Sequence, residues 1–197
     1  MRAEIASLRD SVRDAYSLAA LRPGEHHPFP VGRDFAGSIG YPEELLRQMP
    51  LPAVEAFTGV SNVSIFAEIP AGATVADLGC GAGLDTLIAA RRAGPQGRVL
   101  GIDFSLAMLE RAGESSRALG AANMAFVRAD AERLPVASAS VGVVLVNGIF
   151  NLNPHRDAIF QELARIVKPG GSVFGAELIL RAPLAEDQRA GDANWFS

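Results

Sequence analysis

The residues best suited to chemistry in this chain lie where a short apolar run ends in an acid and three glycines. The run from Thr74 to Ala76 is followed by Asp77, and glycines then stand at positions 79, 81 and 83. Glycine lets the backbone approach a ligand closely, and the start of a helix offers unpaired N–H groups. The pattern therefore predicts a strand, a tight turn and a helix, with a ligand held at the turn.

This turn differs in two ways from the GxGxxG fingerprint of dinucleotide-binding strand–helix units. The glycines follow GxGxG spacing, and Leu84 stands where the fingerprint requires glycine. The carboxylate of Asp77, two positions before Gly79, would repel a pyrophosphate but suits an ammonium group. Both differences favour a nucleoside joined to an amino acid, such as S-adenosylmethionine, over a nucleotide.

Polar residues follow three further predicted strands, where ligands of open α/β sheets bind. Asp103 can accept hydrogen bonds from both ribose hydroxyls, and Phe104 can cover one face of adenine. Asp130, followed by Ala131, can accept a bond from the adenine amino group, and Asn147 would lie beside the methionine part. Each acid or amide also has an ordinary interpretation as a helix cap, a turn residue or a loop residue bonded to its own backbone. Their order along successive strands favours a shared ligand site.

A parallel sheet is needed to bring these residues together. From Thr74 onward, strands and helices alternate, which predicts an α/β fold with helices on both faces of the sheet. Apolar residues at helical spacing predict an amphipathic N-terminal helix, and the Pro- and Gly-rich stretch 22–40 predicts an irregular segment. We expect one compact domain, with residues 1–70 as a helical cap and 71–197 as the ligand-binding core. The expected strands are 74–78, 98–102, 124–128, 141–146 and 172–178, and the expected core helices are 83–93, 105–119 and 154–167.

Local signals mark several of these boundaries. Ser105 is expected as an N-cap and Gly120 as the residue after a helix end. The stretch Lys168-Pro169-Gly170-Gly171 predicts a turn that ends one helix and starts the last strand. Two short helices are expected in the cap, one from Pro42 to Met49 and one from about Pro52.

Composition narrows the class of protein. The 197 residues suffice for one α/β domain, and the formal charge of −4 with interspersed signs argues against a nucleic-acid partner. The apolar stretches are too short for a membrane span, and the N-terminus lacks the apolar core of a signal peptide. The single cysteine excludes an internal disulfide. We expect a cytoplasmic protein that acts on a small molecule.

The glycine loop, Asp103, the pair Asp130-Ala131 and the 168–171 turn together resemble class I S-adenosylmethionine-dependent methyltransferases, from Thr74 to about Leu180. The resemblance implies a Rossmann-like open sheet of strand order 3-2-1-4-5. Residues 181–197 are too few for the family's usual last two strands, so we expect either a core of five strands or a sequence that has been cut short. The resemblance also implies S-adenosylmethionine as cofactor. It places Gly79, Cys80, Gly81 and Gly83 at the methionine portion, Asp103 and Phe104 at the ribose and adenine, and Asp130 and Ala131 at the adenine, with Tyr16 either in the core or in a lid over the cofactor.

Segments 29–32, 40–44, 54–62 and 146–154 look like the corresponding parts of arsenite methyltransferases. Those enzymes hold trivalent arsenic through several cysteine thiolates. Here His26, His27 and Phe29 stand where such cysteines are expected, Gly148 follows Asn147, and the one thiol lies inside the glycine loop. The resemblance therefore carries the fold and the cofactor to this chain, and not arsenite as substrate.

In-line methyl transfer to a small molecule is the leading hypothesis, and no catalytic residue is identified. A metal site is not expected, because the adjacent His26 and His27 would point to opposite sides. His155 is expected at a helix start, and Glu177 either contacts substrate or bonds to a neighbouring loop. The alternatives are a non-catalytic subunit that binds S-adenosylmethionine and a nicotinamide oxidoreductase. An exposed sheet edge, with Trp195-Phe196, favours a homodimer.

Overall fold

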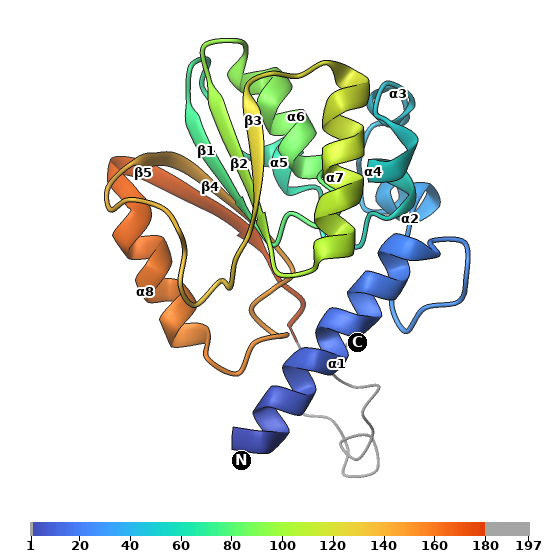
Figure 1. Cartoon of the computed structure of the whole chain (residues 1–197). Coiled ribbons are helices and arrows are strands. Elements are labelled where there is room, and N and C mark those ends of the chain that lie inside the picture. Colours follow the sequence, from blue (N-terminus) through green and yellow to red (C-terminus); the bar gives the residue numbers. More distant parts are fainter. Residues whose placement is uncertain (1, 180–197) are drawn as a thin grey trace.

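A five-stranded parallel sheet forms the centre of the molecule (Figure 1). The structure, a computed structural model, describes residues 2–179, with side chains from residue 8 onward. The strand order β3-β2-β1-β4-β5 is the order expected, and each neighbouring pair is parallel. The strands are β1 (Thr74–Leu78), β2 (Arg98–Asp103), β3 (Met124–Arg128), β4 (Val141–Asn147) and β5 (Val167–Ala176).

Helices cover both faces of the sheet, as the alternating pattern predicts. Successive residues of β4 point to opposite faces, so Val143 and Leu145 pack with one set of helices and Val144 and Val146 with the other. The first face is covered by α5 (Val63–Phe66), α6 (Leu84–Ala93) and α7 (Leu106–Leu119), and the second by α8 (Arg156–Ile166). Because both faces are covered, β1 is buried from Val75 to Leu78, and β4 is apolar from Val141 to Val146.

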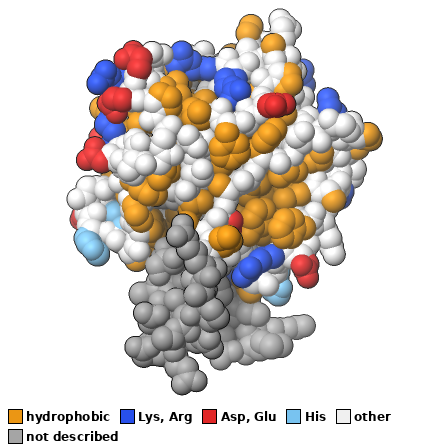
Figure 2. All heavy atoms as spheres, turned by 180° about the vertical axis from the view of Figure 1, so that it is seen from behind, with side chains coloured by type: hydrophobic (Ala, Val, Ile, Leu, Met, Phe, Trp, Pro, Cys, Tyr) orange, Lys and Arg blue, Asp and Glu red, His pale blue; other side chains and the backbone are white. Residues whose placement is uncertain are grey.

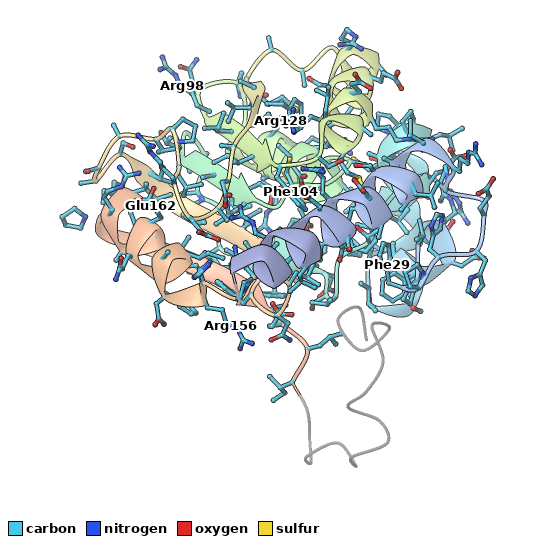
Figure 3. The ribbon with its side chains drawn as sticks, turned by 60° about the horizontal axis from the view of Figure 1, so that its bottom comes forward. Phe29, Arg98, Phe104, Arg128, Arg156 and Glu162 are labelled. Carbon is cyan, nitrogen blue, oxygen red and sulfur yellow. The ribbon has the colours of Figure 1, made fainter. Side chains whose placement is uncertain are left out.

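The N-terminal part is helical and reaches the end of the sheet where β1, β2 and β4 finish. Its helices are α1 (Arg2–Leu21), α2 (Arg33–Ser38), α3 (Glu43–Arg47) and α4 (Leu51–Glu55). Figure 3 shows α1 running across that end of the sheet. The prediction of an irregular segment over 22–40 is wrong in its second half, where α2 forms over Arg33–Ser38. Buried Ala36 and the neighbouring Phe35 anchor α2 in the core, a tertiary contact that the glycine-rich sequence does not reveal.

Both expected caps of α7 are confirmed. The Ser105 hydroxyl accepts a bond from Met108 N at 3.4 Å, and Gly120 has a φ of 62°. The expected turn at 168–171 is wrong in part, because β5 already begins at Val167, directly after α8. Val141 pairs with Val167 and Val143 with Ser172, so the four residues between form a bulge within the strand.

The outer strands β3 and β5 leave backbone edges, and apolar side chains reach the surface near β5. Val173, Leu178 and Ile179 are exposed, the first by 45%. Figure 2 shows apolar side chains gathered over the face turned away from the viewer in Figure 1. The residues expected to extend past β5, with Trp195 and Phe196, lie outside the described part of the chain.

Candidate functional site

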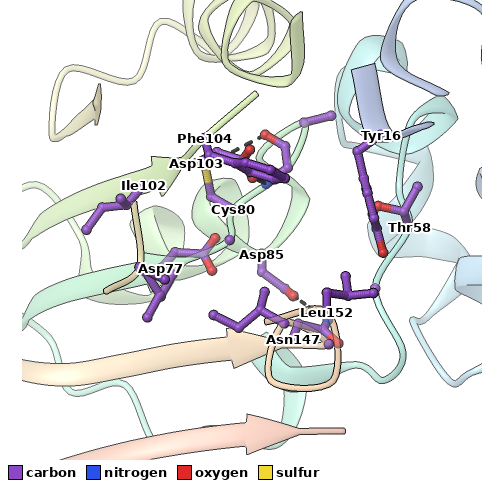
Figure 4. Close-up of a pocket in the computed structure, with 18 of the residues that line it drawn as sticks. Tyr16, Thr58, Asp77, Cys80, Asp85, Ile102, Asp103, Phe104, Asn147 and Leu152 are labelled. Carbon is purple, nitrogen blue, oxygen red and sulfur yellow. Dashed lines mark hydrogen bonds between the residues drawn. The ribbon is translucent and has the colours of Figure 1, made fainter. Parts of the chain in front are cut away.

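A cavity opens under α1 where β1, β2, β3 and β4 end. The empty space between its walls, with the open solvent at its mouth included, is about 1050 Å³. Figure 4 shows side chains from several of these elements facing this space. The predicted residues that line it are Tyr16, Asp77, Gly79, Cys80, Gly81, Asp103, Phe104, Asp130, Ala131 and Asn147.

Gly83 is the one predicted site residue that does not line the cavity. It is the N-cap of α6, with a φ of 89°, and a Cβ there would lie 3.0 Å from Cβ of Ala112 on α7. The placement of Gly83 at the methionine portion therefore stays a prediction, and the structure shows that the absence of a side chain there permits the close packing of α6 against α7.

The glycine loop uses its N–H groups inside the protein. Gly79 N and Cys80 N both donate to Ile102 O, at 2.8 and 3.0 Å. Gly81 N donates to Asp103 Oδ2 at 2.8 Å, and Gly83 N donates to Cys80 O at 2.9 Å. A phosphate-binding loop would turn such donors toward its ligand. These four donors are occupied, so they do not provide a cradle for a diphosphate.

Gly79 is fixed at its position by the backbone and by a neighbour. Its φ is 73°, a conformation that side chains other than glycine rarely adopt. A Cβ there would lie 2.4 Å from Cγ2 of Ile149, which comes from the segment after β4. The loop and that segment therefore close on each other at the cavity only because position 79 has no side chain.

Asp77 is a buried carboxylate at the end of β1. It is 2% exposed, and Thr86 Oγ1 donates to its Oδ2 at 2.5 Å. Burial, then the nearby charge of Asp85, raises the pKa of Asp77 well above its usual range. A cationic group in the cavity would relieve this cost. The position thus suits the ammonium group that the sequence argument assigned to it.

Asp103 ends β2 and faces the cavity from the opposite side to Tyr16 (Figure 4). Its Oδ1 accepts from Ser105 N and its Oδ2 from Gly81 N, both at 2.8 Å. Burial raises the pKa of Asp103, while these backbone bonds act in the opposite direction. A carboxylate oxygen has about two acceptor positions, so each oxygen retains one for a hydroxyl. Phe104 lies beside it as an aromatic wall.

Asp130 is paired to a residue that sequence reasoning missed. Arg9 of α1 forms an ion pair with Asp130 Oδ2, and Glu132 N donates to Asp130 Oδ1 at 3.1 Å. Arg9 also lines the cavity. The sequence signal that could have identified Arg9 is its spacing from Tyr16, which follows seven positions later on the same face of the helix.

Asp85 is the second missed residue, and it organises one wall of the cavity. Its Oδ1 accepts from Tyr41 Oη at 2.6 Å, from Ser64 N at 3.2 Å and from the Ser64 hydroxyl, while its Oδ2 accepts from Asn147 Nδ2 at 2.8 Å. Asn147 Oδ1 in turn accepts from Val60 N and Ser61 N. Asn147 lines the cavity, but its bonds are made to the protein and hold the 60–61 segment in place.

Tyr16 combines the two alternatives left open for it. Its ring stacks on Phe29 at 4.6 Å between centroids, as a core residue would, and it also lines the cavity. Burial, then the charges of Asp103 and Glu177, raises the pKa of Tyr16. The phenol therefore keeps its proton at neutral pH and can only lend a neutral hydroxyl to the site.

The remaining candidates have structural positions. Glu177 bonds to the neighbouring loop, accepting from Phe150 N at 2.7 Å and Asn151 N at 3.2 Å. His155 is the exposed N-cap of α8. Burial raises the pKa of the Cys80 thiol, which disfavours a thiolate. Among the described side chains, those of residues 8–179, no group of three or more metal-ligating residues is positioned to hold a metal ion.

Comparison with known proteins agrees with this geometry. A family model described as a methyltransferase domain matches residues 69–194. An arsenite methyltransferase of Halobacterium salinarum is 38% identical over 66% of this chain and 33% of its own length. A demethylmenaquinone methyltransferase of Lactococcus lactis is 34% identical over 54% of this chain and 42% of its own length.

A crystal structure of an arsenic(III) S-adenosylmethionine methyltransferase from Chlamydomonas reinhardtii superimposes with a TM-score of 0.63 at 25% identity. The match covers 85% of this chain and 57% of that one. The chain thus spans between a third and a half of the curated relatives it matches.

Proposed function

This chain belongs to the methyltransferase-domain family, in the class I fold with S-adenosylmethionine as cofactor, and we propose that it transfers the methyl group in line to a small-molecule acceptor. One observation supports this most directly. The acids Asp77, Asp103 and Asp130 converge on one cavity, while the glycine-loop donors are bonded elsewhere. Such a site favours a cationic ligand without phosphate.

We propose that three carboxylates accept hydrogen bonds from the cofactor. Asp77 would accept from the ammonium group, Asp103 from the ribose hydroxyls, and Asp130 from the adenine amino group. Each carboxylate lies at or just after the carboxyl end of a different strand, so the sheet sets their spacing. Asn147 holds the wall beside the methionine part through Val60 and Ser61. Residues 1–70 would act as the cap over this site, and 71–197 as the core.

The bound cofactor supplies an activated methyl group on sulfur. The protein's contribution is alignment of the acceptor and exclusion of water. Apolar side chains from separate elements give the cavity a dry wall suited to this task, among them Val12, Phe57, Ile149 and Leu152. Asp77, Asp85 and Asp103 are each bonded to protein groups. We propose that these three residues hold the cofactor and the cavity wall, so that an acceptor that arrives protonated loses its proton to another group or to water.

The single cysteine and the acidic lining of the cavity limit which methyl acceptors it can bind. The chain has one cysteine, and burial raises the pKa of its thiol. Trivalent arsenic bound through several protein thiolates is therefore not what this cavity supports. Acids dominate its polar lining, so an anionic acceptor would be repelled. We propose a neutral or cationic, largely apolar acceptor.

Two measurements test the proposed function. Isothermal titration with S-adenosylhomocysteine is expected to give saturable binding in the micromolar range. Incubation with S-adenosylmethionine and a panel of thiols, arsenite, quinols and phenols is expected to yield a methylated product from a quinol, phenol or thiol. Binding without product from any acceptor would favour the non-catalytic subunit. Thermal protection by NAD(P)H but not by S-adenosylhomocysteine would favour the oxidoreductase.

Partners and location are further proposals. Strand β5 is an edge strand of the described sheet, with Val173 exposed. We propose that this edge pairs with a second copy, which light scattering after size exclusion tests.

Among the described helices, none has the length and apolar character to cross a bilayer. A cytoplasmic location stays a prediction, tested by cell fractionation.

A further inference from the structure

One face of α1 forms a wall of the cavity over the carboxyl ends of β2 and β3. Arg9, Val12 and Tyr16 follow one another at helical spacing, and all three line the cavity. The helix is also held at a second point, where Ser17 Oγ lies 2.9 Å from Ser105 Oγ in the N-cap of α7. Ser105 N donates to Asp103, so the anchor adjoins the ribose site.

Arg9 makes its polar contacts with the two acids that follow β3. One nitrogen of its guanidinium contacts Asp130 Oδ2, and the other lies 3.5 Å from Glu132 Oε1. That Glu132 oxygen is buried and accepts no hydrogen bond from the described residues. The side chains of Arg9 and Asp130 are 35% and 38% exposed. Without the guanidinium, the bond from Glu132 N to Oδ1 would remain, but nothing described would hold Oδ2, and the carboxylate of Glu132 would repel Asp130.

We propose that Arg9 is the positioning residue that makes this site selective for adenine. By holding Asp130 Oδ2, it fixes the carboxylate in one orientation at the base end of the cavity. An ionised carboxylate only accepts hydrogen bonds, so it binds the amino group of adenine and repels the carbonyl oxygen of hypoxanthine. The proposal rests on the placement of adenine at Asp130 in the proposed function.

The chain offers a matched control for this role. Arg13 lies one turn further along α1, where it pairs with Asp10 at 2.9 Å, and it does not line the cavity. Arg9→Gln and Arg13→Gln remove the same charge from the same helix and keep most of the aliphatic stem. Arg9→Lys restores the charge without the planar two-pronged geometry of the guanidinium.

The test is isothermal titration of wild type and these variants with S-adenosylhomocysteine and with S-inosylhomocysteine, in which the amino group is replaced by oxygen. In wild type, S-adenosylhomocysteine is expected to bind more tightly. Arg9→Gln is expected to weaken its binding about 5- to 30-fold, the effect of losing one charge-assisted contact. The same variant should bring the ratio of the two affinities toward one. Arg13→Gln should keep both within about twofold, and Arg9→Lys should recover part of the ratio.

Three results would overturn the role of Arg9. Tighter binding in Arg9→Gln would show that Arg9 competes with the base for Asp130. An equal loss for both ligands would show that Arg9 only supports α1. Unchanged affinity for both ligands in Arg9→Gln and in Arg9→Lys would show that Asp130 needs no partner. Absence of S-adenosylhomocysteine binding to wild type is a separate outcome, because it overturns the cofactor placement together with this inference.

Discussion

Asp85→Asn isolates one contact in the polar wall of the cavity. Asp85 Oδ1 faces the donors of Tyr41 and Ser64, and Oδ2 faces Asn147 Nδ2 at 2.8 Å. An asparagine at position 85 would keep its oxygen toward the first group and set its own NH2 against that of Asn147. Asn147 cannot turn around to compensate, because its Oδ1 already accepts from Val60 N and Ser61 N at 2.8 and 3.1 Å.

The cost follows from the loss of one bond to a charged acceptor and from the unpaired donor that remains. Such a loss in a buried site is about 1.5–3 kcal/mol. The substitution also removes the repulsion between Asp85 and Asp77, which offsets part of it. We expect a decrease of about 1–3 kcal/mol in the free energy of unfolding. For a chain of this length, that corresponds to a fall in Tm of roughly 2–12 °C.

Urea unfolding followed by circular dichroism gives the free energies for a double-mutant cycle. The cycle uses wild type, Asp85→Asn, Asn147→Ala and the double variant. If the cost arises at the 85–147 contact, Asp85→Asn should be at least about 1 kcal/mol less damaging in the Asn147→Ala background. An equal cost in both backgrounds would refute this reasoning and place the effect at Tyr41 or Ser64.

Three further outcomes are expected. Because the pKa of Asp77 is raised in the folded protein, the unfolding free energy of the ligand-free protein should fall as pH rises from about 4 through that raised pKa, whereas affinity for S-adenosylhomocysteine should rise. Urea titrations and calorimetry at several pH values should show both trends. Asp77→Asn should weaken both, and the part of the stability trend that comes from the raised pKa of Asp103 should remain. Gly79→Ala should lower the free energy of unfolding by about 1–3 kcal/mol and weaken ligand binding, because φ at this position is 73° and a Cβ would clash with Ile149. Adding Ile149→Ala should recover only the part of this free energy that is due to the clash. Unchanged unfolding curves for Gly79→Ala would contradict the prediction. Cys80→Ala should keep the affinity for S-adenosylhomocysteine within about threefold of wild type, because the pKa of the thiol is raised and the side chain only fills apolar space. A loss of affinity of more than about tenfold by calorimetry would show that the sulfur contacts the ligand.

The order of the chemistry along the chain was readable without coordinates. Asp77, Asp103, Asp130 and Asn147 end successive strands, and parallel strands place their carboxyl ends at one edge, so their meeting in a single cavity was predictable. The glycine spacing also predicted the turn itself. It did not distinguish Gly79 and Gly81, which line the cavity, from Gly83, which packs against α7, because only the path of α7 decides that.

The helical cap was predicted as a region but not in its contacts. The pairing of Arg9 with Asp130 joins residues 121 positions apart, and the bond between Asp85 and Asn147 joins residues 62 apart. No local periodicity encodes such distances. For the same reason, the sequence predicted that Asn147 lies beside the methionine part of the ligand, but not that its amide bonds to the 60–61 segment and Asp85.

The strand order came from the resemblance to class I methyltransferases, whereas the sequence by itself determined the parallel α/β sheet and the acids at its carboxyl edge. These follow from strand-length apolar runs, turn glycines and the right-handed connection of parallel strands, all of which act over short stretches of chain. The tertiary structure alone decided which donors remain free, which carboxylates are buried and which residue of α1 reaches Asp130. Hydrogen-bond partners and burial depend on how separate elements pack, and that packing is set by the whole core rather than by neighbouring residues.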